Sequence, residues 1–249
     1  RFIFAYCFLF VLNPHRLKLS SKENFLVALA GLTGVTLYQF TENLALDFTT
    51  ASNVSIIVGI CPIFTALTSQ IFLKEKHLSF NFCLGFCLAF VGVILVSFNG
   101  KINFNLSPKG DILALISAIC WGFYSLFLTM INKKGHNTIL ITRKIFFYAI
   151  LFMLPLMICG IFAENPKSTA YVELSASLNA ERFSSILNWI LLCFLGIIAS
   201  GFCFVAWNKA CNILGTVKIS TGLYLIPVIT IFFAAILKKK KITLMGTIG

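Results

Sequence analysis

The stretch ASNVSIIVGICPIFTALTSQIFLKEK occupies residues 51–76 and places a proline, Pro62, in the middle of an apolar run. Proline lacks the backbone N–H, so inside a helix it removes a hydrogen bond, at roughly 3 kcal/mol in a soluble host. The run is still long enough for a bilayer core about 30 Å thick, which needs about 20 mostly apolar residues. The stretch therefore predicts a membrane-spanning helix that is interrupted at its centre.

The composition shows that this stretch is one of several such runs. The chain is 59% hydrophobic and only 11% charged, whereas soluble domains carry about 25% charged residues. Apolar runs bounded by charges or turn residues predict helices at 1–12, 25–46, 49–73, 80–98, 110–131, 141–163, 186–208 and 216–237, with a ninth beginning near 242. The pattern predicts an all-α polytopic membrane protein of the plasma membrane. Because the chain begins inside one run and stops inside another, we expect it to be a fragment.

The net charge of +12 is carried mainly by short clusters between the apolar runs. Such clusters meet anionic lipid headgroups at helix ends, and no basic stripe with interleaved aromatics indicates a nucleic-acid partner. The loops on one side of the predicted membrane hold eleven Lys and Arg residues, and those on the other side hold eight. Because positive residues are more frequent in cytoplasmic loops, the side with eleven is expected to be cytoplasmic. The run Lys238–Lys241 opposes this assignment, and nothing in the sequence explains it.

An internal repeat relates two parts of the chain. Shifting the sequence by 165 residues aligns 31–76 with 196–241 without an insertion, and the proline Pro62 then meets Pro227. Further polar and small identities include Asn43 with Asn208 and Ser55 with Ser220. A second block aligns 1–12 with 143–154, with seven identities in twelve positions.

The number of crossings gives the geometry of this repeat. Five steps separate the helix at 49–73 from that at 216–237, so the two copies cross the membrane in opposite directions. Inverted repeats are typical of secondary transporters, in which two copies open a central site alternately to each side. The helix at 110–131 has no counterpart in the chain, so its equivalent should precede Arg1. The full protein is therefore expected to hold two sets of five helices, with the first missing and the tenth truncated here.

Three segments in this order resemble the EamA-type transporters of the drug/metabolite transporter superfamily. They are ENLALDFTTASNVSIIVGICPIFTALTSQIFLKEKHLSF, GDILALISAICWGFYSLFLTMINKK and WNKACNILGTVKISTGLYLIPVITIFFAAIL. The resemblance implies a ten-helix fold with both termini cytoplasmic, and export of small metabolites, often amino acids or related compounds. It divides the chain into one repeat at 1–98 and a second at 110–249. The family more often shows Gly-Glu or Lys-Glu where this chain has Lys238–Lys241, which puts that turn in doubt.

Paired interrupted helices at corresponding positions of two repeats are the best sequence pointer to a transport site. Here the interruptions are Pro62 and Pro227, which also fit a packing kink. Carbonyls freed by a proline can be met by hydroxyls, water or substrate. The polar residues one or two turns before the prolines are candidates for the cavity, namely Ser55 in the first copy and Ser220 and Tyr224 in the second.

Several other residues in apolar runs are candidates to line the substrate cavity. Glu42 is acidic within an apolar segment, which suggests a handle for a proton or another cation, although a carboxylate reaching the interface fits almost as well. Tyr38 lies one turn earlier on the same face. Aromatic and amide groups complete the set, namely Asn43, Trp121, Tyr124, Trp207 and Asn208. These fit a pocket wall with a few polar contacts, or an interfacial aromatic belt.

Other classes of function find less support. No Walker A loop, H-E-x-x-H or G-x-S-x-G motif is present, so we expect neither ATP hydrolysis nor intramembrane catalysis, and no catalytic residue or cofactor. All nine cysteines lie in or at the ends of apolar runs, and Cys83 and Cys87 share a face without completing a metal set. An antiporter of phosphorylated or nucleotide-linked sugars, a membrane sensor or scaffold, and a homodimer remain open. The expected partners are a small-molecule substrate, the lipid bilayer and a coupling ion.

Overall fold

A computed structural model of the chain describes residues 1–98, 107–162, 184–226 and 229, and every regular element in that part is helical. The elements are α1 (Phe2–Leu12), α2 (Ser21–Gly31), η1 (Leu32–Leu37), α3 (Tyr38–Phe48), α4 (Ala51–Val58), α5 (Cys61–Leu73), α6 (Phe80–Phe98), α7 (Pro108–Asn132), α8 (Thr138–Phe162), α11 (Ile186–Phe194), η3 (Leu195–Phe202), α12 (Cys203–Leu214), α13 (Thr216–Thr221) and η4 (Gly222–Tyr224). Two of the η segments, η1 and η3, are π-helical turns inside longer helices, and η4 is a 3₁₀ turn.

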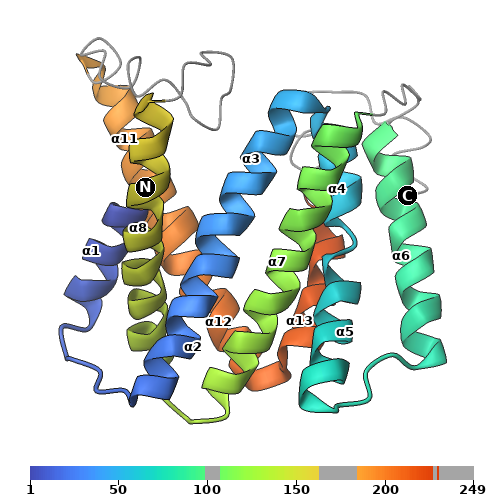
Figure 1. Cartoon of the computed structure of the whole chain (residues 1–249), viewed down its shortest axis with the longest axis horizontal. Helices are drawn as coiled ribbons and strands as arrows, with labels where there is room; N and C mark the ends of the chain where they lie inside the picture. Colours follow the sequence, from blue (N-terminus) through green and yellow to red (C-terminus); the bar gives the residue numbers. More distant parts are fainter. Residues whose placement is uncertain (99–106, 163–183, 227–228, 230–249) are drawn as a thin grey trace.

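The described part of the chain contains five helices that are long and apolar enough to cross a membrane. They are Ser21–Phe48, Ala51–Leu73, Pro108–Asn132, Thr138–Leu156 and Ile186–Leu214. When α6 (Phe80–Phe98), which lies between the second and third of these spans, is included, successive helices run in opposite directions, as Figure 1 shows. The predicted all-α polytopic membrane fold is therefore confirmed. The predicted ninth helix near 242, Pro227 and Lys238–Lys241 lie outside the described residues.

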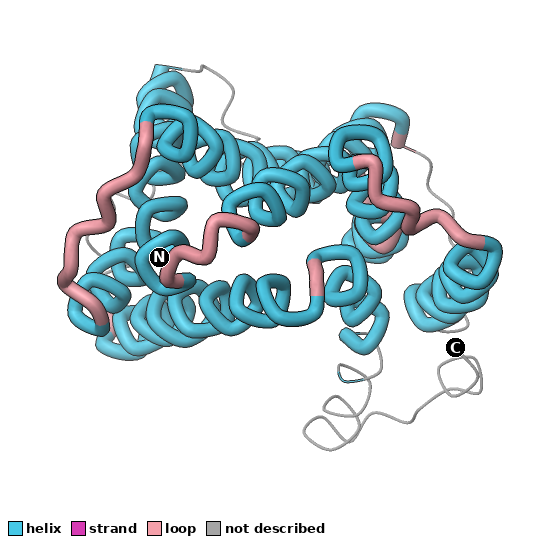
Figure 2. The backbone as a smooth tube through the Cα atoms, turned by 90° about the horizontal axis from the view of Figure 1, so that it is seen from below, coloured by secondary structure: helices cyan, strands magenta, loops and turns pink. Residues whose placement is uncertain are grey.

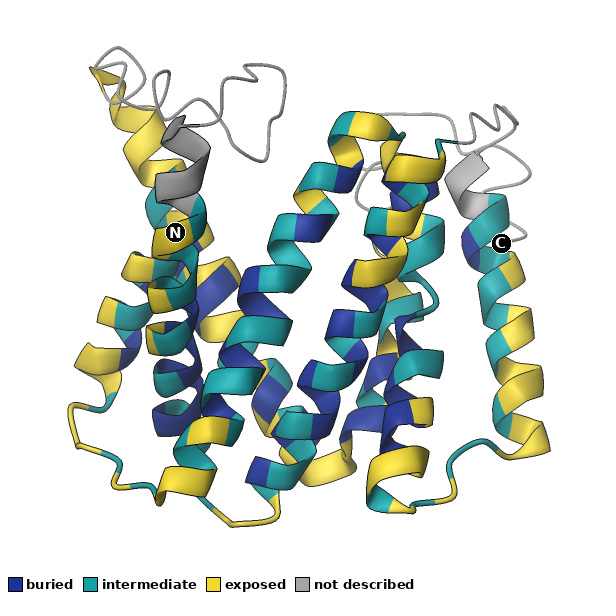
Figure 3. Cartoon of the chain, in the orientation of Figure 1, coloured by how far each residue is buried: buried dark blue, intermediate teal, exposed yellow. Residues whose placement is uncertain are grey.

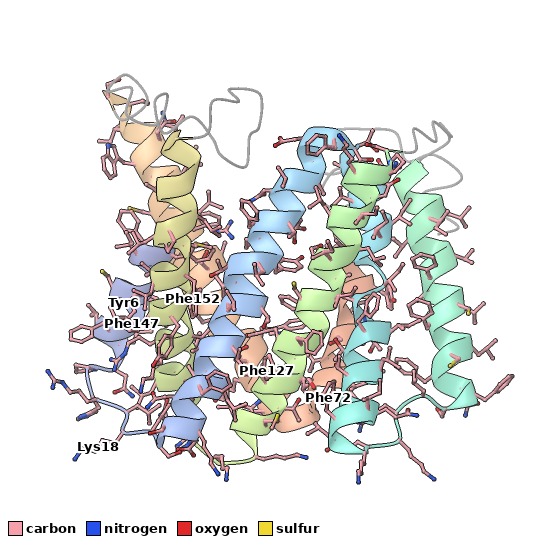
Figure 4. The ribbon with its side chains drawn as sticks, viewed as in Figure 1. Tyr6, Lys18, Phe72, Phe127, Phe147 and Phe152 are labelled. Atoms are coloured by element: carbon pink, nitrogen blue, oxygen red, sulfur yellow. The ribbon has the colours of Figure 1, made fainter. Side chains whose placement is uncertain are left out.

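One end of the bundle carries the loops 13–20, 74–79 and 133–137, and we call it the lysine-rich end. Figure 2 views the molecule from this end, with these loops across the near ends of the helices. The side chain of Lys18 points away from the bundle here (Figure 4). The alternating loop pattern of the sequence therefore brings the predicted basic clusters to one end.

Local sequence signals explain where the helices begin and end at the lysine-rich end. Helix α2 begins with a capping box, in which the Ser20 hydroxyl accepts from the Glu23 N–H and the Glu23 carboxylate accepts from the Ser20 N–H. Helix α12 ends at Gly215, whose positive φ of 89° suits glycine. Sequence reasoning therefore placed these elements well, but it did not predict the π-helical turns inside them.

The predicted helix 49–73 proved to be two helices, because the chain turns at Gly59 and Ile60 between α4 and α5. Pro62 then lies in the first turn of α5, where a missing N–H leaves little unsatisfied. The predicted helix 216–237 likewise changes geometry early, since α13 ends at Thr221 and η4 follows. The first helix is therefore interrupted, but one turn before Pro62, whereas the predicted interruption at Pro227 lies outside the described residues.

Helix α7 occupies the centre of the bundle and packs against α2, α3, α4 and α5. Buried residues gather along α7 and the faces that surround it, whereas α6 and α11 are mostly exposed (Figure 3). Small residues allow the closest approaches: a Cβ at Gly122 would lie 2.9 Å from the Cβ of Phe64 on α5. The core therefore brings residues of α7 against both interrupted helices.

Candidate functional site

The break between α4 and α5 leaves a backbone carbonyl that the helix does not satisfy. The N–H of Ile63 donates to the carbonyl of Ile60 at 2.9 Å, rather than to Gly59 one residue earlier. The hydroxyl of Tyr224 donates to the Gly59 carbonyl at 2.7 Å instead. Tyr224 is a predicted cavity residue of the second copy, so the two interrupted helices meet directly. A hydroxyl from one half completes the hydrogen bonding of the break in the other.

Buried hydroxyl groups continue this contact along α13, α5 and α7. The Oγ of Ser220 is 3.4 Å from the Oγ1 of Thr65, which is in turn 3.3 Å from the Oγ of Ser125. One turn further on, the hydroxyls of Thr129 and Thr216 lie 2.7 Å apart. Because the five residues are buried or partly buried, these bonds replace water at a close helix–helix interface.

Four aromatic rings form a cluster around Trp121 on α7. The centroid of its ring lies 5.0 Å from that of Tyr38 on α3, 5.2 Å from Tyr124 and 5.7 Å from Trp207 on α12. These are ordinary distances for favourable aromatic pairs. The indole N–H of Trp121 is buried and has no hydrogen-bond partner within the described residues. We call these four residues the aromatic cluster.

The carboxylate of Glu42 lies next to the aromatic cluster. The hydroxyl of Tyr38 donates to Oε1 of Glu42 at 3.3 Å, and the Glu42 side chain is only partly buried. Glu42 also lies near Arg1 and near Cys61, the first residue of α5. It forms no direct ion pair with any residue in the described ranges. An intramembrane carboxylate therefore lies beside both the aromatic cluster and the break.

On the other side of the cluster, Tyr124 belongs to a buried polar network. Its hydroxyl donates to Oδ1 of Asn208 at 2.5 Å, and Nδ2 of Asn208 donates to the hydroxyl of Thr142 at 2.9 Å. All three side chains are fully buried. The network joins α7, α12 and α8, and its geometry fits a structural role better than direct substrate contact.

The structure brings most of the predicted cavity residues together. Contacts connect Glu42 to Tyr38, then through Trp121 to Trp207 and Tyr124, and from there to Asn208. Ser220 lies against Thr65 of α5, and Tyr224 lies against Gly59 at the break between α4 and α5. Asn43 and Ser55 are both exposed, apart from this group.

Sequence reasoning missed several residues of the site. Neither Arg1, at the start of the first apolar run, nor Thr142, at the start of a later one, stands out in the sequence as a polar residue deep in an apolar run. The hydroxyl contacts could have been anticipated, since Thr65 with Ser69 and Ser125 with Thr129 repeat at the i, i+4 spacing of one helix face. Their partner on α13, Thr216, could be identified only from the fold.

Charged groups hold the lysine-rich end together. The Arg143 guanidinium donates to the carbonyls of Asn13 and His15, the latter at 2.6 Å. A ring nitrogen of His136 lies 3.0 Å from Oε1 of Glu23, which connects the α7–α8 loop to α2. The ammonium of Lys133 lies 2.8 Å from Oε1 of Glu75. Hydrogen bonds and ion pairs therefore connect loops from distant parts of the chain at this end.

The Lys133 ammonium has a clear effect on the Glu75 carboxyl, which lies outside the membrane-spanning helices. Its hydrogen bond, together with that from His77, lowers the pKa of Glu75 from 4.5 to about 2. Glu75 therefore stays charged at every physiological pH.

The fold is that of a polytopic membrane protein. Residues 1–98 and 108–249 match the EamA-like transporter family, and the chain belongs to that family. This result confirms the resemblance seen in the sequence, and it makes the chain a multi-pass integral membrane protein.

Similar proteins carry transporter names. An uncharacterized transporter of Archaeoglobus fulgidus is 28% identical over 93% of this chain and 74% of its own length. The transporter YyaM of Bacillus subtilis, also uncharacterized, is 24% identical over 82% of this chain and 62% of its own length. A probable terminal-alkyne amino-acid exporter of Streptantibioticus cattleyicolor is 24% identical over 84% of this chain and 63% of its own length. This chain thus spans about two thirds of such relatives.

A solved crystal structure shares the fold. It superposes with a TM-score of 0.75 over 99% of this chain and 79% of the other, at 17% sequence identity. At that identity the likeness concerns the fold alone.

Proposed function

We propose that the protein is a secondary transporter that exports small organic metabolites, amino acids or related compounds, across the plasma membrane. The observation that carries the proposal is the contact of Tyr224 with the freed carbonyl of Gly59 at 2.7 Å. It brings the two interrupted helices together, which is where transporters with inverted repeats bind their substrates. The nearby aromatic cluster supplies an apolar wall, and Glu42 supplies a charged group for a proton or another cation.

The direction and the substrate class of this proposal draw on a relative. One similar protein is named as a probable amino-acid exporter, at 24% identity. Glu42 beside an apolar wall is compatible with such a compound, because it can meet a cationic group while the rings contact hydrocarbon. Alternating access would then exchange the roles of the two halves around the break.

The test is transport by the full-length protein in proteoliposomes. Uptake and efflux of labelled amino acids, amines, organic acids and sugar phosphates are measured with and without a pH gradient. We expect movement of at least one amino acid or related metabolite, faster when a gradient is imposed. Failure of every solute to move under any gradient would contradict the proposal, and movement of sugar phosphates alone would favour an antiporter of those compounds.

A further inference from the structure

The Glu42 carboxylate is short of partners. A carboxylate has about four lone-pair sites, yet the hydroxyl of Tyr38 at 3.3 Å is its one hydrogen-bond donor among the described residues. Glu42 lies within the membrane-spanning segment Ser21–Phe48. An anion at that depth is costly unless a cation or several donors approach it. Arg1 acts on Glu42 without forming a direct ion pair, so among the described residues the carboxylate beside Tyr38 is a place where a further positive group can bind.

The surroundings of this place favour an organic cation over a hydrated metal ion. Described residues provide no group of three His, Cys, Asp or Glu side chains that could replace the water around a metal. They provide aromatic rings instead, because Tyr38 bonds to Glu42 and packs on Trp121 at 5.0 Å. Ring faces attract alkylammonium groups, whose charge is already partly dispersed by their hydrocarbon.

The aromatic cluster extends away from Glu42 and could receive the apolar remainder of such a molecule. Trp121 connects Tyr38 to Trp207, so the cluster runs from α3 in the first half to α12 in the second. A ligand with its charge at Glu42 and its apolar body on these rings would contact both halves. That is the requirement for a substrate that both conformations of an inverted-repeat transporter must hold.

We propose that Glu42 is the amine-recognising residue of this transporter, and that its substrates carry a protonated amine next to an apolar body that packs on the aromatic cluster. The inference rests on the proposed function and names the chemistry of its substrates. Arg1 interacts electrostatically with Glu42 without a direct ion pair. A compound that also carries a carboxylate can therefore place that group toward Arg1, so a zwitterion binds better than the amine alone.

The test uses three compounds with one apolar body: phenylalanine, phenethylamine and 3-phenylpropionate. Binding to the full-length protein in detergent is followed by tryptophan fluorescence, because Trp121 and Trp207 belong to the cluster. We expect the zwitterion to bind most tightly, then the amine, and the acid at least ten-fold more weakly than the amine. Glu42→Gln should weaken binding of both amines at least ten-fold, and Glu42→Asp should restore part of it.

A matched control removes a different carboxylate from the same helix. Asp47→Asn should leave all three affinities within about two-fold, and thermal unfolding in detergent checks that every variant is folded. Equal binding of the acid and the amine, unchanged amine binding by Glu42→Gln, or no binding of either amine would each overturn the inference. The proteoliposome panel separates these outcomes from failure of the proposed function, because the transporter could still move solutes that lack an amine.

Discussion

The two halves of the molecule share one register of elements. The π-helical segments η1 and η3 end at Leu37 and Phe202, which are 165 residues apart. The helices that follow, α3 and α12, begin 165 residues apart, and so do α4 and α13. Tyr224 and Gly59, whose side chain and carbonyl meet at the break, are separated by the same 165 positions. These coincidences support the inverted repeat, because helix irregularities at functional sites do not arise from apolar composition alone.

Corresponding residues of the two halves nevertheless differ in burial. Asn208 is 0% exposed and Ser220 is 1% exposed, whereas Asn43 and Ser55 are both exposed. In an inverted repeat, equivalent turns lie at opposite ends of the bundle. The buried pair flanks the turn at Gly215, on the lysine-rich side, where ion pairs also connect the loops. We interpret the structure as a state in which the lysine-rich end is closed.

The largest loss of stability should come from adding a methyl group at a glycine whose equivalent in the other half is alanine. Gly34 corresponds to Ala199, but a Cβ at Gly34 would lie 2.2 Å from Cδ2 of the buried Tyr124. Gly34→Ala should therefore destabilise the protein by about 3 kcal/mol, at the upper end of overpacking costs. Thermal unfolding in detergent measures the loss.

The control for this prediction is another helical glycine with space around it. A Cβ at Gly85 meets no atom within 4 Å, so Gly85→Ala should be neutral or slightly stabilising. If Gly34→Ala and Gly85→Ala unfold at the same temperature, Tyr124 can move aside. Close packing on Tyr124 would then not explain why glycine is present at position 34.

A smaller effect is expected from removing the buried amide. Asn208→Ala leaves the Tyr124 and Thr142 hydroxyls without their partner, at about 2 kcal/mol for buried polar groups. The equivalent change Asn43→Ala, at an exposed position, should stay within about 0.5 kcal/mol. Comparing the unfolding of the two variants tests the burial difference directly. Equal losses of stability would contradict the assignment of a buried role to Asn208 and an exposed one to Asn43.

The hydroxyl at the break offers a third test. Tyr224→Phe removes the donor to the Gly59 carbonyl and should cost about 1 kcal/mol, the net value of one hydrogen bond. Because the contact joins the two halves, transport should slow as well. Tyr6→Phe is the matched control, since the Tyr6 ring packs on Phe147 at the side of the bundle. Equal transport by both variants would mean that the contact is not part of the transport cycle.

Much of this arrangement could be predicted from the sequence. Apolar run length predicted most of the described helix ends to within a few residues, because a bilayer leaves few alternatives to a helix, although the run predicted to end at 208 continues to Leu214. The repeat located Tyr224 and Ser220, and polar residues in apolar runs located Glu42, Trp121 and Asn208. The π-helical segments could not be predicted, since no residue type encodes them and they depend on packing against neighbouring helices.

The burial of Asn208 and exposure of Asn43 were also beyond the sequence. The two residues are identical and occupy equivalent positions, so no local pattern separates them. Their difference depends on which end of the bundle is closed, and that is a property of the conformation. The contact of Thr65 with Ser220 could not be predicted either, because it depends on how α13 packs against α5.

The smallest effect concerns the ion pair of Glu75 and Lys133, which connects the end of α5 to the end of α7 at the lysine-rich end. Glu75 is 36% exposed and Lys133 is 54% exposed, so solvent screens the pair and Glu75→Gln should cost less than about 1 kcal/mol. Lys133→Gln should cost a similar amount. The double variant should lose less than the sum of the two, because they share one interaction.

The pH dependence of this loss has a definite sign. The folded-state pKa of Glu75 is lowered from 4.5 to about 2, so its contribution is complete above pH 4.5 and declines as the pH falls toward 2. The difference in unfolding temperature between wild type and Glu75→Gln should therefore be constant from pH 8 to 5 and shrink below 4.5. A difference that grows as the pH falls would contradict the assigned pair. Because the pair fastens the closed end, Glu75→Gln should also favour opening there, and an unchanged transport rate would show that this pair does not hold the end shut.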